Sequence, residues 1–240
     1  NGFHNNHGAV FVFSGNTKKY ISPYVSTTAG FEIQKRLVDY ADLISLEDEK
    51  YLELLPPIEI KSQLMPPEVL AENGGPGWDE FSCKYKFSLE VSSVLNPQGH
   101  MIYHKENLWD YNEATTWAEG SRGDGTGEWI DFALAEKDKF DGSFFGSFVI
   151  INGYTRTENV YKWNSRAKTM ICYWNQKPVF RVHLLDKPDP QRFMLTEFQD
   201  KIHPATFSNS DVLHFVIEEI YPGEKYKDLC ISEFFPTCNP

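Results

Sequence analysis

The chain contains 240 residues, of which 34 are acidic and 23 are basic, so its formal net charge is −11. That length suffices for one large β domain, or for a domain of about 150 residues with a smaller unit beside it. The excess of acidic side chains argues against nucleic acid or an anionic membrane surface as a charge-driven partner. No apolar run reaches the roughly 20 residues of a transmembrane helix.

The first part of the chain predicts a small α+β unit. Residues 9–13 (AVFVF) have the composition of a strand and are followed by Ser-Gly-Asn. Residues 31–44 predict the longest helix, because apolar residues such as Leu37 and Ala41 recur at helical spacing. Residues 56–67 begin and end with Pro-Pro pairs and predict an extended arm outside the core.

Residues 72–78 (ENGGPGW) carry the strongest linker signal, so we expect residues 1–78 to form an N-terminal unit and residues 79–240 a β domain. No long amphipathic helix is visible after residue 83, which favours an antiparallel jelly-roll β-sandwich. Short strand-like runs recur there at the intervals of a sandwich: residues 83–95, 128–134, 144–151, 168–174, 179–185, 192–198, 212–220 and 229–235.

Alternation along these runs separates a buried face from an exposed one. Phe180 and Val182 share one face of their strand, and Arg181 takes the other. The same alternation places Glu218 and Glu219 on opposite faces, so they cannot act as a facing acid/base pair. The chain also lacks G-x-S-x-G and H-E-x-x-H, and the sequence therefore does not predict a hydrolase.

The chain opens at Asn1 without Met, so we expect a mature or trimmed form whose targeting segment has been removed. An even number of cysteines, Cys83, Cys172, Cys230 and Cys238, gives mild support for an oxidising compartment. No C-x-x-C occurs, and thiolate metal binding is not expected. First and last strands of a sandwich often lie close together, which suggests a Cys83–Cys238 disulfide; Cys230–Cys238 is the open alternative.

Residues 107–130 predict a structured loop in which turn-forming residues alternate with three tryptophans. Asp110, Asn112, Glu113 and Thr115 bring oxygen donors close together, which suits calcium better than a transition metal. The alternative is a run of turns capped by its own side chains. Arg-Gly-Asp at residues 122–124 is a three-letter match that arises easily by chance.

The chain resembles a known family over roughly residues 92–235. It is similar to the discoidin-like, galactose-binding-like β-sandwiches, and among them to the glycan-binding type associated with the translocation domain of streptococcal NAD glycohydrolase. The resemblance rests on several blocks in order: NLWD (107–110), TWAEG (116–120), GTGEWI (125–130), NGY (152–154), Tyr161 with NSR (164–166), YPGEKY (221–226) and CISE (230–233).

The resemblance implies an accessory module without NAD cleavage, and hence a protein that is not an enzyme. It also implies a structural calcium ion bound by Asp110, Asn112, Thr115 and the distant Glu233. The family commonly has Phe-Asp-Gly-Asp where this chain has Trp-Asp-Tyr-Asn at 109–112, so a turn glycine and one carboxylate are replaced. In the alternative reading, Glu233 accepts hydrogen bonds from loop amides.

A sugar ligand needs an apolar ring to lie against and planar groups that bind adjacent hydroxyls. The candidates come from loops that a sandwich gathers at one end: Trp117, Glu119, Asn152, Tyr154, Arg166, Tyr226 and Asp228. The alternatives are edge packing for Trp117 and Tyr154, and for Arg166 an ion pair with Glu119 or Asp228.

These expectations together predict a non-catalytic glycan-binding module of a secreted or surface-anchored bacterial protein, with no cofactor other than the possible calcium ion. The alternative is a structural or protein-interaction domain of an exported assembly. Neither reading fixes the glycan or an oligomeric state.

Overall fold

A computed structural model of the chain describes residues 2–4, 10–14, 19–22, 36–39, 57–66, 82, 84–134, 146–195 and 211–237. The chain divides into two compact units, Asn1–Leu55 and Pro56–Pro240. The expected boundary at residue 78 differs from this division, and the Gly-rich segment that suggested it lies outside the described residues.

The first unit contains a four-stranded antiparallel meander, with strands β1 (Gly2–His4), β2 (Val10–Ser14), β3 (Lys19–Ser22) and β4 (Arg36–Asp39). Strand β2 confirms the strand expected at residues 9–13. The prediction of a helix over residues 31–44 is wrong at β4, which pairs with β3 in a register that places the Cα of Val38 opposite that of Tyr20. Ladder hydrogen bonds and a β-branched side chain outweigh a short helical periodicity there.

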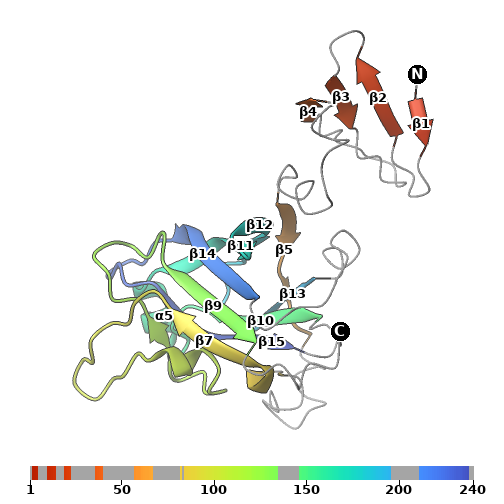
Figure 1. The fold of residues 1–240 in the computed structure, drawn as a ribbon. Coiled ribbons are helices and arrows are strands. Elements are labelled where there is room, and N and C mark those ends of the chain that lie inside the picture. Colours follow the sequence, from red (N-terminus) through yellow and green to blue (C-terminus); the bar gives the residue numbers. More distant parts are fainter. Residues whose placement is uncertain are drawn as a thin grey trace. The chain divides into compact units, whose positions relative to one another are not determined.

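The second unit is a β-sandwich (Figure 1). The strands of one sheet lie in the order β5-β12-β11-β14-β9-β7: β5 (Ile58–Lys61), β12 (Lys177–His183), β11 (Arg166–Trp174), β14 (Val212–Tyr221), β9 (Trp129–Leu134) and β7 (Phe87–Val91). The strands of the other lie in the order β6-β13-β10-β15-β8: β6 (Gln63–Leu64), β13 (Gln191–Met194), β10 (Ser147–Asn152), β15 (Cys230–Thr237) and β8 (Trp117–Ala118). All ladders between described strands after residue 83 are antiparallel.

All eight strands predicted after residue 83 are confirmed, and so is the mainly β fold. The prediction that residues 56–67 lie outside the core is wrong, because β5 pairs in parallel with β12 and the side chain of Ile60 is buried. A Pro-Pro pair restricts the residues before it but leaves the alternating Ile-Glu-Ile-Lys that follows free to join a sheet edge. The sequence analysis also missed the short strand β8 and helix α5 (Glu158–Trp163).

Six phenylalanines fill the space between the two sheets, three from each. Phe132, Phe180 and Phe215 come from the six-stranded sheet, and Phe148, Phe193 and Phe234 from the five-stranded one; all are almost completely buried. Their rings interlock across the interface, mostly edge to face, with centroid distances such as 4.9 Å for Phe215 and Phe234. Alternation at Phe180, Arg181 and Val182 is as predicted, since only the arginine is half-exposed.

Ion pairs on the outer face tie the parallel edge strand to its neighbours. Arg181 on β12 pairs with Glu59 on β5 and Glu218 on β14, and Glu59 also contacts His183. Glu219 pairs instead with Lys168. Each exposed pair contributes little to stability, and of these pairs only the two contacts of Glu59 join β5 to β12.

The cysteine expectations are resolved in part. Cys172 and Cys230 are buried free thiols, so the Cys230–Cys238 pairing is not formed. Cys83 and Cys238 lie outside the described residues, and their pairing stays a prediction. Among the described residues no helix is long and apolar enough to cross a membrane.

Candidate functional site

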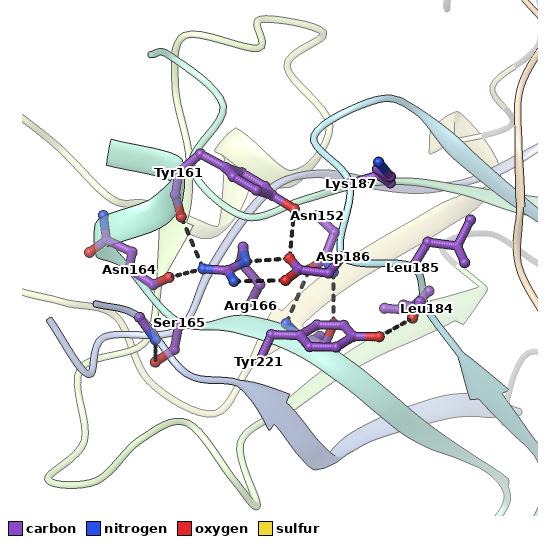
Figure 2. A network of polar contacts seen from close by, with 12 residues as sticks. Asn152, Tyr161, Asn164, Ser165, Arg166, Leu184, Leu185, Asp186, Lys187 and Tyr221 are labelled. Carbon is purple, nitrogen blue, oxygen red and sulfur yellow. Dashed lines mark hydrogen bonds and ion pairs between the residues drawn. The ribbon is translucent and has the colours of Figure 1, made fainter. Parts of the chain in front are cut away.

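Arg166, at the start of β11, is the centre of a buried polar network. Its Nε and Nη2 donate to the two carboxylate oxygens of Asp186 at 2.7 and 3.0 Å. Its Nη1 donates to the backbone carbonyls of Tyr161 and Asn164 at 3.1 and 2.7 Å. Figure 2 shows the guanidinium facing Asp186, with the hydroxyl of Tyr161 donating to the same carboxylate.

This network holds α5 and the turn after β12 against β11, and it leaves the guanidinium no free edge for a ligand. Burial alone raises the pKa of Asp186, but the hydrogen bonds and charge of Arg166 lower it by more. Burial and the bond to Asp186 raise the pKa of Tyr161. The expected partners of Arg166, Glu119 and Asp228, do not pair with it; Asp186 does.

Two other predicted ligand residues are core residues. Trp117 is fully buried, and its indole N–H donates to the carbonyl of Ser93 at 2.9 Å. Asn152 is equally buried, with its amide bonded in both directions to the backbone of Ala167. Neither side chain offers a face to a ligand, so both stabilise the core. For Trp117 this agrees with the alternative given above, packing within the sandwich.

Tyr226, Asp228 and Tyr154 do come together, and Tyr103 joins them; we call these four residues the Tyr226 cluster. Tyr103 packs with Tyr154 and Cys230 in one buried cluster, and the Cys230 thiol donates to the Asp228 carbonyl at 3.8 Å. Burial raises the pKa of Tyr103, and the ionisable groups Tyr154, Cys230, Asp228 and Tyr226 raise it further. The ring of Tyr226 is 40% exposed. The Tyr154 hydroxyl is buried and has no hydrogen-bond partner.

Asp228 gives the cluster its charge. Burial raises the pKa of this carboxyl, and no basic side chain of the described residues forms an ion pair with it. Tyr154 packs with Tyr103, Ala118 and Cys230, so the inner side of the cluster rests on the sandwich. An exposed ring beside a carboxylate without a cationic partner can accept a ligand that presents both a flat apolar face and hydroxyl donors.

The loop that carries the cluster is fixed to α5. The N–H groups of Glu224 and Tyr226 donate to the carbonyls of Lys162 and Trp163, and Ser165 N–H donates to the Asp228 carbonyl. Gly223 is required here, because a Cβ would come within 2.4 Å of the Trp163 carbonyl oxygen. The Tyr226 ring is therefore positioned before any ligand arrives, which lowers the entropic cost of binding.

Sequence reasoning missed three residues at this position. Trp163 packs edge to face on Tyr226 with centroids 6.5 Å apart, and the Lys225 Nζ lies over both rings at 4.7 and 4.8 Å. Trp163 directly precedes the Asn-Ser-Arg block at 164–166, which is a signal that could have indicated it. Tyr103 lies outside every block, and nothing in the sequence points to it.

The loop at residues 110–115 is held by hydrogen bonds with its own side chains. Asp110 Oδ1 accepts from the N–H of Asn112 at 2.9 Å, and Oδ2 accepts from the Thr115 hydroxyl at 2.8 Å. Asn112 Oδ1 accepts from the N–H of Ala114 at 3.1 Å. Tyr111 adopts φ 62°, so the left-handed turn that a glycine favours is kept by a tyrosine whose ring packs on Phe235.

Glu233 reaches this loop from β15. It is fully buried, and neither carboxylate oxygen has a hydrogen-bond partner. Burial and the adjacent Asp110 carboxylate raise its pKa to about 9, although the nearby N–H groups of Tyr111 and Asn112 oppose the shift. Two orphaned oxygens beside a second carboxylate are chemically suited to a hard cation. Within the described residues no group of three or more His, Cys, Asp or Glu side chains could hold a metal ion.

Comparisons with known proteins agree with the resemblance seen in the sequence. The family model of the NAD glycohydrolase translocation F5/8 type C domain matches residues 82–235. No curated protein matches the chain.

Solved structures that match part of the chain include the CBM32-1 and CBM32-2 domains of Clostridium perfringens ZmpB, at 9% identity and a TM-score of 0.49. That match covers 76% of this chain and 41% of the other. The arabinofuranosyltransferase AftD from Mycobacteria matches at 12% identity and a TM-score of 0.41, over 62% of this chain and 10% of the other. The chain thus spans less than half the length of either.

Proposed function

Because the chain belongs to the family of NAD glycohydrolase translocation F5/8 type C domains, we propose that it is a non-catalytic glycan-binding module of a secreted or surface-anchored bacterial protein. The observation that carries the proposal is the Tyr226 cluster: an exposed ring beside a carboxylate without a cationic partner, on a loop fixed by backbone hydrogen bonds. Of the seven ligand residues expected from the sequence, Tyr154, Tyr226 and Asp228 remain in the proposed site.

In this proposal the Tyr226 ring packs against the C–H face of one sugar ring, and Asp228 accepts hydrogen bonds from its hydroxyls. Tyr154 packs on the inner side of the site, where its buried hydroxyl has no hydrogen-bond partner. The cluster contains no base paired with a nucleophile and no second carboxylate facing Asp228, which fits binding without turnover. The exposed Lys225 and the half-buried Trp163 form the rim.

The first test is a glycan array probed with the whole chain and with Tyr226→Ala. Specific signals are expected for the wild type, and the variant should bind the best glycan on the order of tenfold more weakly, since an aromatic anchor contributes about 1.4 kcal/mol. Tyr85→Ala, at an exposed ring outside the cluster, should bind like the wild type. Equal binding by the wild type and Tyr226→Ala would place the site elsewhere.

One observation favours a second function, a protein-interaction domain. Ile102, the residue before Tyr103 in the chain, is an apolar side chain that is 52% exposed. A blank array combined with capture of one specific protein, lost in Ile102→Asp, would favour this reading over glycan binding.

We also propose that Asp110, Asn112, Thr115 and Glu233 hold a structural calcium ion. The orphaned oxygens of Glu233 support the proposal, as does the Asp110 carboxylate beside them. Calcium would supply the positive charge that this carboxylate pair lacks. It would also link the loop at residues 110–115 to β15, more than a hundred residues further along the chain.

Calcium that binds only the folded chain must stabilise it, by about 2.7 kcal/mol at a hundred times the dissociation constant. Thermal melts of metal-free protein are therefore expected to shift upward with added calcium and to return with chelator. Glu233→Gln should abolish most of the shift, whereas Glu158→Gln, at an exposed position, should keep it. Identical melting curves with chelator and with millimolar calcium would show that Glu233 is not a calcium ligand.

A further inference from the structure

The Gly-rich loop at residues 120–127 lies between two glutamates, Glu119 and Glu128. Glu119 follows β8, and its N–H donates to the Leu229 carbonyl; Glu128 precedes β9, and its carbonyl accepts from the N–H of Ile217. The loop is packed tightly between these points, since a Cβ on Gly125 would come within 2.3 Å of the Leu229 side chain. Both carboxylates are thus held by the fold on either side of one compact loop.

Serine residues hydrogen-bond to each of the two carboxylates, and Ser93 also links Glu128 to the backbone of Gly120, the residue after Glu119. Ser121 donates to Glu119 Oε2 through its N–H at 2.8 Å and its hydroxyl at 3.0 Å. The Ser93 hydroxyl donates to Glu128 Oε2 at 2.5 Å and accepts from the Gly120 N–H at 2.8 Å. The Ser92 hydroxyl also donates to Glu128 Oε2. The result is a cluster of carboxylate and hydroxyl oxygens.

The charges of this cluster are not compensated by the described residues. Glu119 is 1% exposed, and its Oε1 is buried without a hydrogen-bond partner. Burial chiefly raises the pKa of Glu119 and the charge of Glu128 adds to this, although the hydrogen bonds with Ser121 and Leu229 lower it in part. No Lys, Arg or His of the described residues forms an ion pair with either glutamate.

We propose that Glu119, Glu128 and the Ser121 hydroxyl, with Ser92 and Ser93 behind them, form a second cation site that binds a hard divalent ion such as calcium and fastens the 120–127 loop. An oxygen-only donor set favours such an ion over zinc or copper. The site shares no residue with the Asp110–Glu233 site. Its donors are already fixed by backbone hydrogen bonds, so little ordering accompanies binding.

The site can be read out directly, because two tryptophans flank it. Trp117 donates to the carbonyl of Ser93, and the Trp129 N–H donates to the Ser92 hydroxyl. Terbium(III), which replaces calcium at oxygen sites, emits when a nearby indole is excited. Metal-free whole chain carrying Glu233→Gln is titrated with terbium and, in parallel, with calcium in an isothermal calorimeter. Saturable indole-sensitised emission, displaced by calcium, is expected in this background.

Adding Glu119→Gln or Glu128→Gln to that background should weaken binding on the order of tenfold or more, since each removes one charged ligand. Adding Glu106→Gln, at an exposed position, should change nothing. Ser121→Ala leaves both carboxylates in place and should weaken binding less, so it keeps the test usable if a glutamate variant unfolds. The proposal is overturned if the Glu233→Gln parent shows no saturable binding, or if Glu119→Gln and Ser121→Ala give the same titration as this parent. Either result holds whatever the outcome at Glu233.

Discussion

Phe148→Ala is expected to lower the free energy of unfolding by about 3–5 kcal/mol, the usual cost of truncating a fully buried phenylalanine. Phe148 lies on β10 and contacts rings of both sheets: Phe193 and Phe234 from its own sheet, and Phe132 and Phe215 from the opposite one. Its removal leaves a cavity that the surrounding rigid rings cannot fill. Urea denaturation of the whole chain, followed by tryptophan fluorescence, gives the difference.

Two comparisons make this measurement specific. Phe148→Leu should cost less, because it keeps part of the buried volume. Ile102→Ala, at a half-exposed side chain, should stay within about 0.5 kcal/mol of the wild type. A midpoint for Phe148→Ala equal to that of the wild type would mean that the six rings do not form the core of this sandwich.

Arg166→Ala is the second large effect, with an expected loss of about 2–4 kcal/mol. The substitution leaves the carbonyls of Tyr161 and Asn164 without a donor and the Asp186 carboxylate without its cation. The value lies below that of a fully buried pair, because 40% of the Asp186 side chain remains exposed and keeps some hydration. Lys162→Ala, which breaks the exposed pair with Glu158, should cost less than about 1 kcal/mol.

The pH dependence separates this ion pair from simple packing. The pKa of Asp186 is lowered in the folded chain, so its contribution is present above its ordinary pKa and is lost as the pH falls through the lowered value. The stability difference between wild type and Asp186→Asn is therefore expected to be largest at neutral pH and to shrink in acid. A difference that stays constant down to the acid limit of the folded state would contradict the ion-pair account.

The fold was largely predictable because alternation along a strand is a local property. The eight runs after residue 83 alternate or are uniformly apolar, and each became a strand. Strand β5 was missed because its partner β12 lies more than a hundred residues away, and a Pro-Pro pair precedes it. The helix predicted over residues 31–44 was wrong at β4 for a related reason. A short apolar periodicity fits a helix, but residues 36–39 pair with β3 as a strand.

The site was less predictable, because a sequence block does not show which side of the chain a residue faces. Trp117 and Asn152 lie in blocks that resemble the family, yet both serve the core. The proximity of Glu233 to Asp110 could be expected only through the resemblance, since no local pattern links them. Tyr103 completes the Tyr226 cluster from a segment with no motif at all.

The most direct measurement of the central proposal follows the six tryptophan indole N–H signals by nuclear magnetic resonance, while the labelled chain is titrated with the best glycan from the array. We expect the signal of Trp163, which packs on Tyr226, to shift saturably. The signal of Trp117, buried and bonded to Ser93, should stay in place. If binding saturates while Trp163 does not move, or no array glycan causes any shift, the Tyr226 cluster is not a glycan site.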